Sequence, residues 1–137
     1  MGYLYCWIHR PIYDALYEYN RNLAVFKVGR AENVVKRIDD EKKETSNLGV
    51  IEVIWIIEID DEKTAETTLK HYLASKSAID TKVVSKDKEW YNCDIPNAEE
   101  VIDIIGGGNK IDEKYLRDNQ LDVLVTNYIN GKNPDFL

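Results

Sequence analysis

Hydrophobic and polar positions along the chain alternate between a period of two and a helical period, and this pattern predicts the elements. Residues 2–9 and 22–29 are rich in aromatic and β-branched residues, which predicts two strands. The connection between them contains "IYDALYEY", which fits a short helix, and Pro11, which should end the first strand. The run "GVIEVIWIIEI" at 49–59 predicts a strand that is buried on both faces and central in its sheet.

Helices are expected where apolar residues recur every three to four positions, at residues 34–45, 62–76 and 98–105, with one or two more within 111–130. Asn33, Asp60 or Asp61, and Asn97 precede these segments as candidate N-caps. Three consecutive glycines at 106–108 should end the helix that Asn97 begins. Residues 81–85 and 88–95 fit short extended pieces, and the tail from 130 fits a loose terminus.

Strands and helices interleave after an early antiparallel hairpin, which predicts the α+β class or a small α/β sandwich. A chain of 137 residues fits one domain with a modest core. No apolar run reaches the roughly 20 residues that a membrane span requires, and no signal peptide is evident. Two separated cysteines, Cys6 and Cys93, indicate reduced thiols, so we expect a cytoplasmic or nuclear protein.

Charge is unevenly distributed along the chain. The net charge of -7 divides into -1 for residues 1–88 and -6 for residues 89–137. An acidic protein is a poor prior for binding nucleic acid, because phosphate neutralisation dominates that affinity. The nearly neutral first two thirds, with local lysines and arginines, leaves nucleic acid open as a partner.

Glu66 is the first residue with candidate chemistry. It falls at the edge of the apolar stripe of its predicted helix, where a carboxylate can face a cleft and hold Mg²⁺ together with waters and a substrate phosphate. The alternative is a surface ion pair with Lys70, four residues later, and periodicity alone favours it.

Arginine, glycine and tyrosine side chains supply the other candidates. Arg37 flanks the apolar stripe of its helix and can reach a phosphate with its planar guanidinium, or it is a solvated arginine paired with Glu41. Arg30 has the same two interpretations. Gly29 either has a positive φ or allows a close approach of backbone or substrate. Tyr3 and Tyr5 share one face of a strand. Their phenols either take part in acid–base chemistry or simply pack in the core. Trp90 fits a core position or a cleft wall.

Taken in order, "YLY" at 3–5, "KVG" at 27–29, Arg37, Glu66 and "EWY" at 89–91 resemble the GIY-YIG nuclease superfamily. The similarity is greatest to the phage- and large-DNA-virus-associated branch, which has lysine in place of the second motif tyrosine. The resemblance covers about residues 2–95. It implies a small antiparallel three-stranded sheet flanked by helices, with residues 96–137 as an acidic helical C-terminal extension.

The resemblance further implies a metal-dependent endonuclease that hydrolyses DNA phosphodiester bonds with one Mg²⁺ or Mn²⁺. It places Tyr5, Lys27 and Arg37 in catalysis and Glu66 on the metal. Residues expected to bind substrate are Tyr3, Gly29, Arg30, Lys70, Glu89 and Trp90.

Four positions depart from the family pattern. Lys27 replaces a tyrosine, Lys70 stands where a histidine is expected, and Lys88 replaces a glycine. The histidine that some relatives carry in the first helix would fall near Glu41. These departures leave two alternatives: a catalytically weak or inactive nucleic-acid-binding module on the same fold, or a protein-interaction domain that uses the acidic extension. Oligomeric state and DNA preference do not follow from the sequence.

Overall fold

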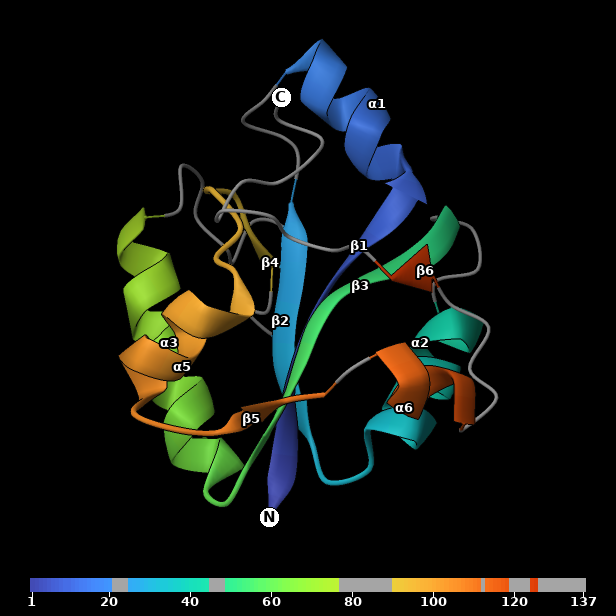
Figure 1. The fold of residues 1–137 in the computed structure, drawn as a ribbon. Helices are drawn as coiled ribbons and strands as arrows, with labels where there is room; N and C mark the ends of the chain where they lie inside the picture. The colour runs from blue at the N-terminus through green and yellow to red at the C-terminus, as the bar shows by residue number, and fades with distance from the viewer. Residues whose placement is uncertain (21–24, 45–48, 77–89, 112, 119–123, 126–137) are drawn as a thin grey trace.

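A computed structural model of the protein describes residues 1–20, 25–44, 49–76, 90–111, 113–118 and 124–125. It is an α+β fold in which helices cover both faces of one sheet (Figure 1). The elements are, in order, β1 (Gly2–Pro11), α1 (Ile12–Tyr19), β2 (Phe26–Ala31), α2 (Val34–Glu44), β3 (Gly49–Ile59), α3 (Glu62–Lys76), β4 (Trp90–Tyr91), α5 (Ala98–Ile105), β5 (Asn109–Lys110), α6 (Glu113–Asp118) and β6 (Leu124–Val125).

The sheet is built on the three long strands that the sequence predicts, β2, β1 and β3, which pair antiparallel in that order. It is wider than three strands, because β4 extends it beyond β2 and β5 extends it beyond β3. β6 pairs with β3 in parallel. The prediction of a three-stranded sheet therefore underestimated the number of strands. Each added strand has only two residues in its ladder, too few to carry a period-two pattern.

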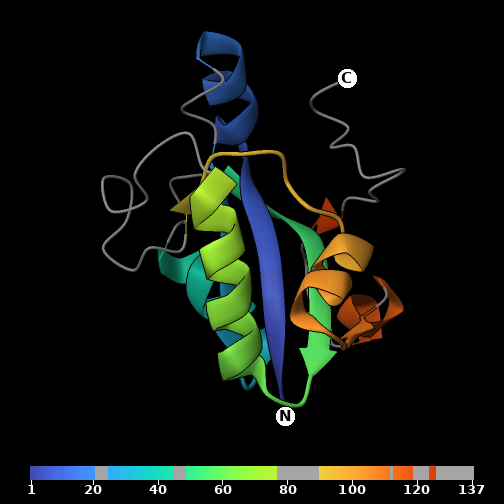
Figure 2. The ribbon, with the colours of Figure 1, turned by 90° about the vertical axis from the view of Figure 1, so that its left-hand side faces the viewer.

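Two hydrophobic clusters lie on opposite faces of the sheet. Leu4, Cys6 and Ile8 of β1 pack in one cluster with residues of α3 and α5, and Figures 1 and 2 show these helices side by side on that face. Tyr5 and Trp7 alternate with them and pack in the other cluster with residues of α2. We call these the α3 face and the α2 face. β3 is buried on both, as predicted.

Local signals fix the helix starts. Asn33 accepts a hydrogen bond from the Lys36 amide, and Asp61 does the same for the Thr64 amide, at 3.1 and 3.2 Å. Asn97 caps α5 in the same way. Gly106 ends that helix with a left-handed φ of 81°. All three capping predictions are confirmed, with Asp61 rather than Asp60 as the cap of α3.

The C-terminal segment is not only helical. α5 packs Ala98 and Val101 into the core of the α3 face, β5 pairs with β3, and α6 spans only six residues. Helix was predicted for residues 124–125, which instead form β6. The division of the chain at residue 95 stays a prediction. The extended piece at 81–85, Lys88, Glu89 and the tail after 125 lie outside the described residues.

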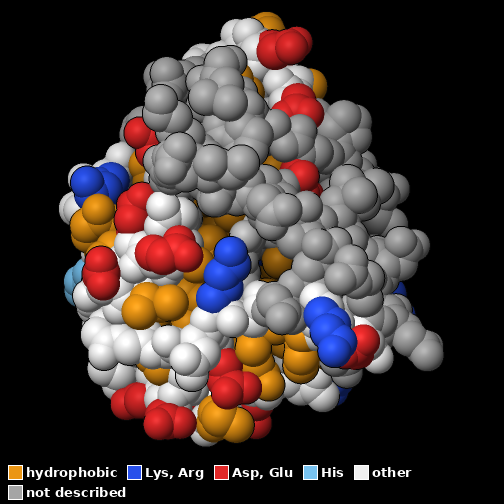
Figure 3. Space-filling model, in the orientation of Figure 1, with side chains coloured by type: hydrophobic (Ala, Val, Ile, Leu, Met, Phe, Trp, Pro, Cys, Tyr) orange, Lys and Arg blue, Asp and Glu red, His pale blue; other side chains and the backbone are white. Residues whose placement is uncertain are grey.

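Among the described helices, none is both long and apolar enough to cross a membrane. The face drawn in Figure 3 has acidic side chains around the region of α3 and α5. Glu99 and Glu100 lie in the first turn of α5 and are exposed. Acidic groups here make this region of the surface unfavourable for a polyanion.

Candidate functional site

Four side chains meet around the buried carboxylate of Glu41 on the α2 face, and we call the five residues the Glu41 cluster: Trp7, His9, Lys27, Arg37 and Glu41. The Lys27 ammonium donates to both oxygens of Glu41, at 3.0 and 3.2 Å. Arg37 Nη2 donates to Oε2 at 3.0 Å. His9 Nε2 and Trp7 Nε1 lie 3.3 and 3.4 Å from Oε1. The Glu41 side chain is fully buried.

Strand register and helix period bring these residues together. Trp7 lies directly opposite Lys27 in the β1–β2 ladder, so both side chains are on the α2 face. Arg37 and Glu41 are four residues apart on α2 and therefore share one side of that helix. Trp90, next to Lys27 in the β2–β4 ladder, completes the surroundings with its ring 5.5 Å from the Lys27 ammonium.

The charges of the cluster decide the state of Glu41. Burial alone would raise the pKa of this carboxyl, but the hydrogen bond with His9 and the charges of Lys27 and Arg37 lower it to about 2. Glu41 is therefore ionised at neutral pH, and two cations, Lys27 and Arg37, contact this one carboxylate.

A second group of charges surrounds Glu66 on the α3 face, and we call Arg30, Glu66 and Lys70 the Glu66 cluster. Arg30 Nε is 3.3 Å from Oε1, and the Lys70 ammonium is 3.5 Å from Oε2. The Glu66 side chain is 15% exposed, so water and small ions reach it. Here too, two cations contact one carboxylate.

The two clusters flank β2 from opposite faces of the sheet. Arg30 is opposite Leu4 in the ladder and thus on the α3 face, whereas Lys27 is on the α2 face. Both α2 and α3 contact β2. Tyr5, Lys27 and Arg37 are brought to one face and Glu66 to the other, so a ligand that contacted both groups would have to reach across β2.

Tyr5 fills the space above Gly29. The Tyr5 ring stacks on Trp7, with centroids 3.9 Å apart and planes 8° apart, and its side chain is 1% exposed. A Cβ at residue 29 would lie 2.3 Å from the Tyr5 hydroxyl oxygen. Among the glycines described, positive φ values occur only at 106–108, so close approach, rather than a special φ, explains this glycine.

The remaining candidates lie further apart. Tyr3 is on the α2 face near Tyr115 of α6, with ring centroids 6.4 Å apart. Hydrogen bonding with Tyr115, burial and nearby Glu58 raise the pKa of Tyr3 to about 12, so it stays a neutral phenol. Trp90 belongs to the surroundings of Lys27 and is half-buried. Glu89 lies outside the described residues.

Both ion pairs expected from helix spacing are present, Arg37 with Glu41 and Glu66 with Lys70. The first of them is not the solvated surface pair that the sequence suggested, because Glu41 is fully buried. Sequence reasoning did not include Glu41, His9 or Trp7 among the site residues. The four-residue spacing from Arg37 pointed to Glu41, but its burial depends on strand pairing far away in sequence. The roles of the site residues in chemistry stay predictions.

Metal binding can be judged from the donor groups. No group of three or more His, Cys, Asp or Glu side chains suited to a metal occurs within the described part of the chain. A single accessible carboxylate such as Glu66 does fit Mg²⁺ or Mn²⁺, which accept one carboxylate when waters and a substrate phosphate complete the shell. Arg30 and Lys70 each contact one of its two oxygens.

The order of these features along the fold is that of a domain related to the GIY-YIG nucleases, and the family comparison agrees. The sequence matches the family model of the T5orf172 domain over residues 2–106. The chain belongs to the T5orf172 domain family, which is related to the GIY-YIG nucleases. No curated protein and no solved structure matched the sequence.

Proposed function

We propose that this protein is an endonuclease that hydrolyses DNA phosphodiester bonds with one divalent cation, and that it belongs to the phage- and large-DNA-virus-associated branch of its superfamily. The observation that supports this most directly is that two cations contact one carboxylate on each side of β2. Lys27 and Arg37 share the single carboxylate of Glu41, and Arg30 and Lys70 share that of Glu66.

Arg37 is the group proposed to hold the scissile phosphate. Its side chain is 23% exposed, whereas that of Glu41 is fully buried, so Arg37 links the buried charge to the surface. A guanidinium has five N–H donors in a fixed plane, which allows it to contact a carboxylate and a phosphate together. The buried contacts of Glu41 hold Arg37 and Lys27 in place before substrate binds.

Glu66 is the proposed metal ligand. A divalent cation bound there would act as a Lewis acid for the phosphoryl oxygens. In the free protein Arg30 and Lys70 neutralise this carboxylate. A DNA phosphate would take over these two cations on binding, which would leave the oxygens of Glu66 to hold the metal. This exchange predicts that metal and DNA bind cooperatively.

Tyr5 is the proposed proton acceptor for the attacking water. Its ring is held between Trp7 and Gly29, which fixes the position of the hydroxyl. Because the Tyr5 side chain is almost fully buried, the bound substrate or cation must bring the attacking water to its hydroxyl before a proton can be transferred.

The test is cleavage of supercoiled plasmid DNA with Mg²⁺ or Mn²⁺, compared with a chelator. We expect nicking by the wild type and none by Glu66→Gln, with the melting temperature nearly unchanged, since a partly exposed ion pair contributes at most about 1 kcal/mol. Glu99→Gln, an exposed acid on α5, is the matched control and should cut like the wild type. Cleavage by Glu66→Gln at the wild-type rate would contradict the proposal that Glu66 is the metal ligand.

A second candidate is a nucleic-acid-binding module without catalysis. The 1% exposure of Tyr5 and the paired oxygens of Glu66 favour it, because both groups must change partners before they can act. If the wild type binds DNA with a steep salt dependence and does not cut, this candidate replaces the endonuclease. Weak, salt-insensitive DNA binding would instead favour the third candidate, a protein partner at the acidic C-terminal segment.

A further inference from the structure

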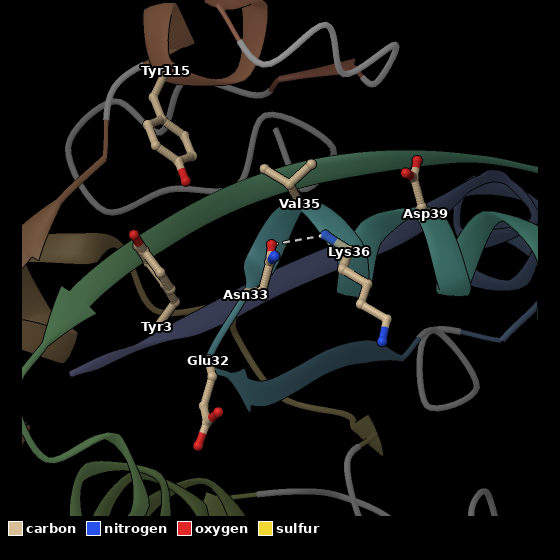
Figure 4. Close-up of a pocket in the computed structure, with 7 residues that line it drawn as sticks. All are labelled: Tyr3, Glu32, Asn33, Val35, Lys36, Asp39 and Tyr115. Atoms are coloured by element: carbon tan, nitrogen blue, oxygen red, sulfur yellow. Dashed lines mark hydrogen bonds between the residues drawn. The ribbon is translucent and has the colours of Figure 1, made fainter.

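A groove of about 530 Å³ lies at the start of α2. Tyr3 of β1 and Tyr115 of α6 line it together with four polar residues at and after the β2–α2 turn: Glu32, Asn33, Lys36 and Asp39. Figure 4 shows the two tyrosine hydroxyls pointing toward each other at one end, with Asp39 at the other. This volume is within the range of small-molecule sites, about 300 to 1,000 Å³.

The aromatic end of the groove offers a stacking surface. The rings of Tyr3 and Tyr115 are 6.4 Å apart and tilted by 35°, so they already contact each other and leave no gap for a third ring between them. A planar ligand would therefore extend the pair by stacking on its open side. Both tyrosines are half-buried, which leaves part of each ring accessible.

The charges of the groove select against a phosphate inside it. Glu32 and Asp39 are exposed carboxylates, and Lys36 is the one cation among the lining residues. Ionised carboxylates only accept hydrogen bonds, so they favour a neutral ring with N–H donors. The exocyclic amino groups of adenine and cytosine are such donors, whereas thymine has no amino group and donates only through its ring N3–H.

The groove is also placed next to the proposed phosphate contact. Lys36 and Arg37 are consecutive on α2 and point about 100° apart around its axis. A ligand whose ring lies in the groove would therefore bring its attached phosphate towards Lys36 and Arg37. Tyr115 lies beyond residue 106, the end of the family match, so the groove combines the family domain with a segment outside that match.

We propose that the groove between the start of α2 and the Tyr3–Tyr115 pair binds one unstacked nucleobase of the nucleic acid, with a preference for bases that carry an exocyclic amino group. This inference deepens the proposed function, on which it rests for the identity of the larger ligand. It makes Tyr115 a base-stacking residue of the C-terminal segment.

The test uses nucleosides, which lack a phosphate, and therefore does not depend on cleavage. NMR spectra of the backbone amides of the full chain are recorded during titration with adenosine, cytidine and thymidine. We expect saturable shifts at Asn33 and Lys36 with adenosine and cytidine, and weaker binding of thymidine. Tyr115→Ala should weaken adenosine binding by about 5- to 100-fold, the range for loss of one base–aromatic stack.

Two further variants keep the test decisive. Tyr19→Ala removes a tyrosine of α1 that is 83% exposed and should leave binding unchanged. If Tyr115→Ala does not fold, Asp39→Asn provides the answer, because it should reduce the preference for adenosine over thymidine. No saturable shift in the wild type, or undiminished binding in Tyr115→Ala, overturns the proposal. Nucleoside binding without DNA cleavage would support the nucleobase site in the groove and contradict only the proposed endonuclease activity.

Discussion

Replacing Glu41 by glutamine should destabilise the protein strongly, because it removes the only charge that balances Lys27 and Arg37 within this cluster. The substitution keeps the size of the side chain and its place on α2. It leaves two cations at 3.0 Å from a neutral and fully buried amide. Breaking a buried ion pair by removing one partner typically costs about 3 to 5 kcal/mol.

The pKa of Glu41 gives an independent magnitude. Its fall from 4.5 to about 2 means that the ionised form is favoured in the folded state. A tenfold change in proton affinity corresponds to about 1.4 kcal/mol, so this difference stabilises the fold by about 3 kcal/mol. Because the folded pKa is the lower one, this contribution is fully present above about pH 4.5 and is lost as the pH falls towards 2.

Urea unfolding followed by tryptophan fluorescence measures this effect, and Trp7 lies within the cluster. At pH 7 we expect Glu41→Gln to lose about 3 kcal/mol or more of unfolding free energy. Below pH 4.5 the difference from the wild type should narrow. Glu66→Gln is the control, with a loss under about 1 kcal/mol because its pair is partly exposed. A loss below about 1 kcal/mol for Glu41→Gln, unchanged with pH, would refute this account of the cluster.

Two other predictions concern the residues on either side of the cluster. Gly29→Ala places a Cβ 2.3 Å from the Tyr5 hydroxyl and should lower the unfolding free energy by about 1 to 3 kcal/mol, measured by thermal or urea unfolding. The loss should be smaller in a Tyr5→Ala background, and an equal loss in both backgrounds would show that Tyr5 is not the cause. Arg37→Lys keeps the charge but loses the planar fork, so single-turnover cleavage should fall by about 100-fold or more with little change in melting temperature; a folding defect with unchanged turnover would make Arg37 structural.

Periodicity and capping predicted most of the larger elements. The helix at 62–76 and the strand at 49–59 match α3 and β3, because each has a continuous pattern and a clear boundary. The short strands β4, β5 and β6 could not be predicted, because each pairs only two residues and depends on the edge that the long strands present.

The sequence named Lys27, Arg30, Arg37 and Glu66 as candidates but did not give their arrangement. Lys27 and Arg30 are three positions apart on one strand, and this odd spacing already places them on opposite faces. The burial of Glu41 could not be inferred, since it requires His9 from β1 and Lys27 from β2 to meet α2. A carboxylate next to three potential cations in space looks in sequence like an ordinary helix-surface acid.

The central claim is that the Glu41 and Glu66 clusters act on one phosphodiester across β2. Single-turnover DNA cleavage by Arg37→Lys, Glu66→Gln and the variant with both changes tests it most directly. Residues that act as a unit on the same transition state are strongly non-additive, so the double variant should be hardly slower than the slower single variant. If the two rate losses multiply instead, or if the wild type does not cut DNA at all, the two clusters do not form one catalytic site.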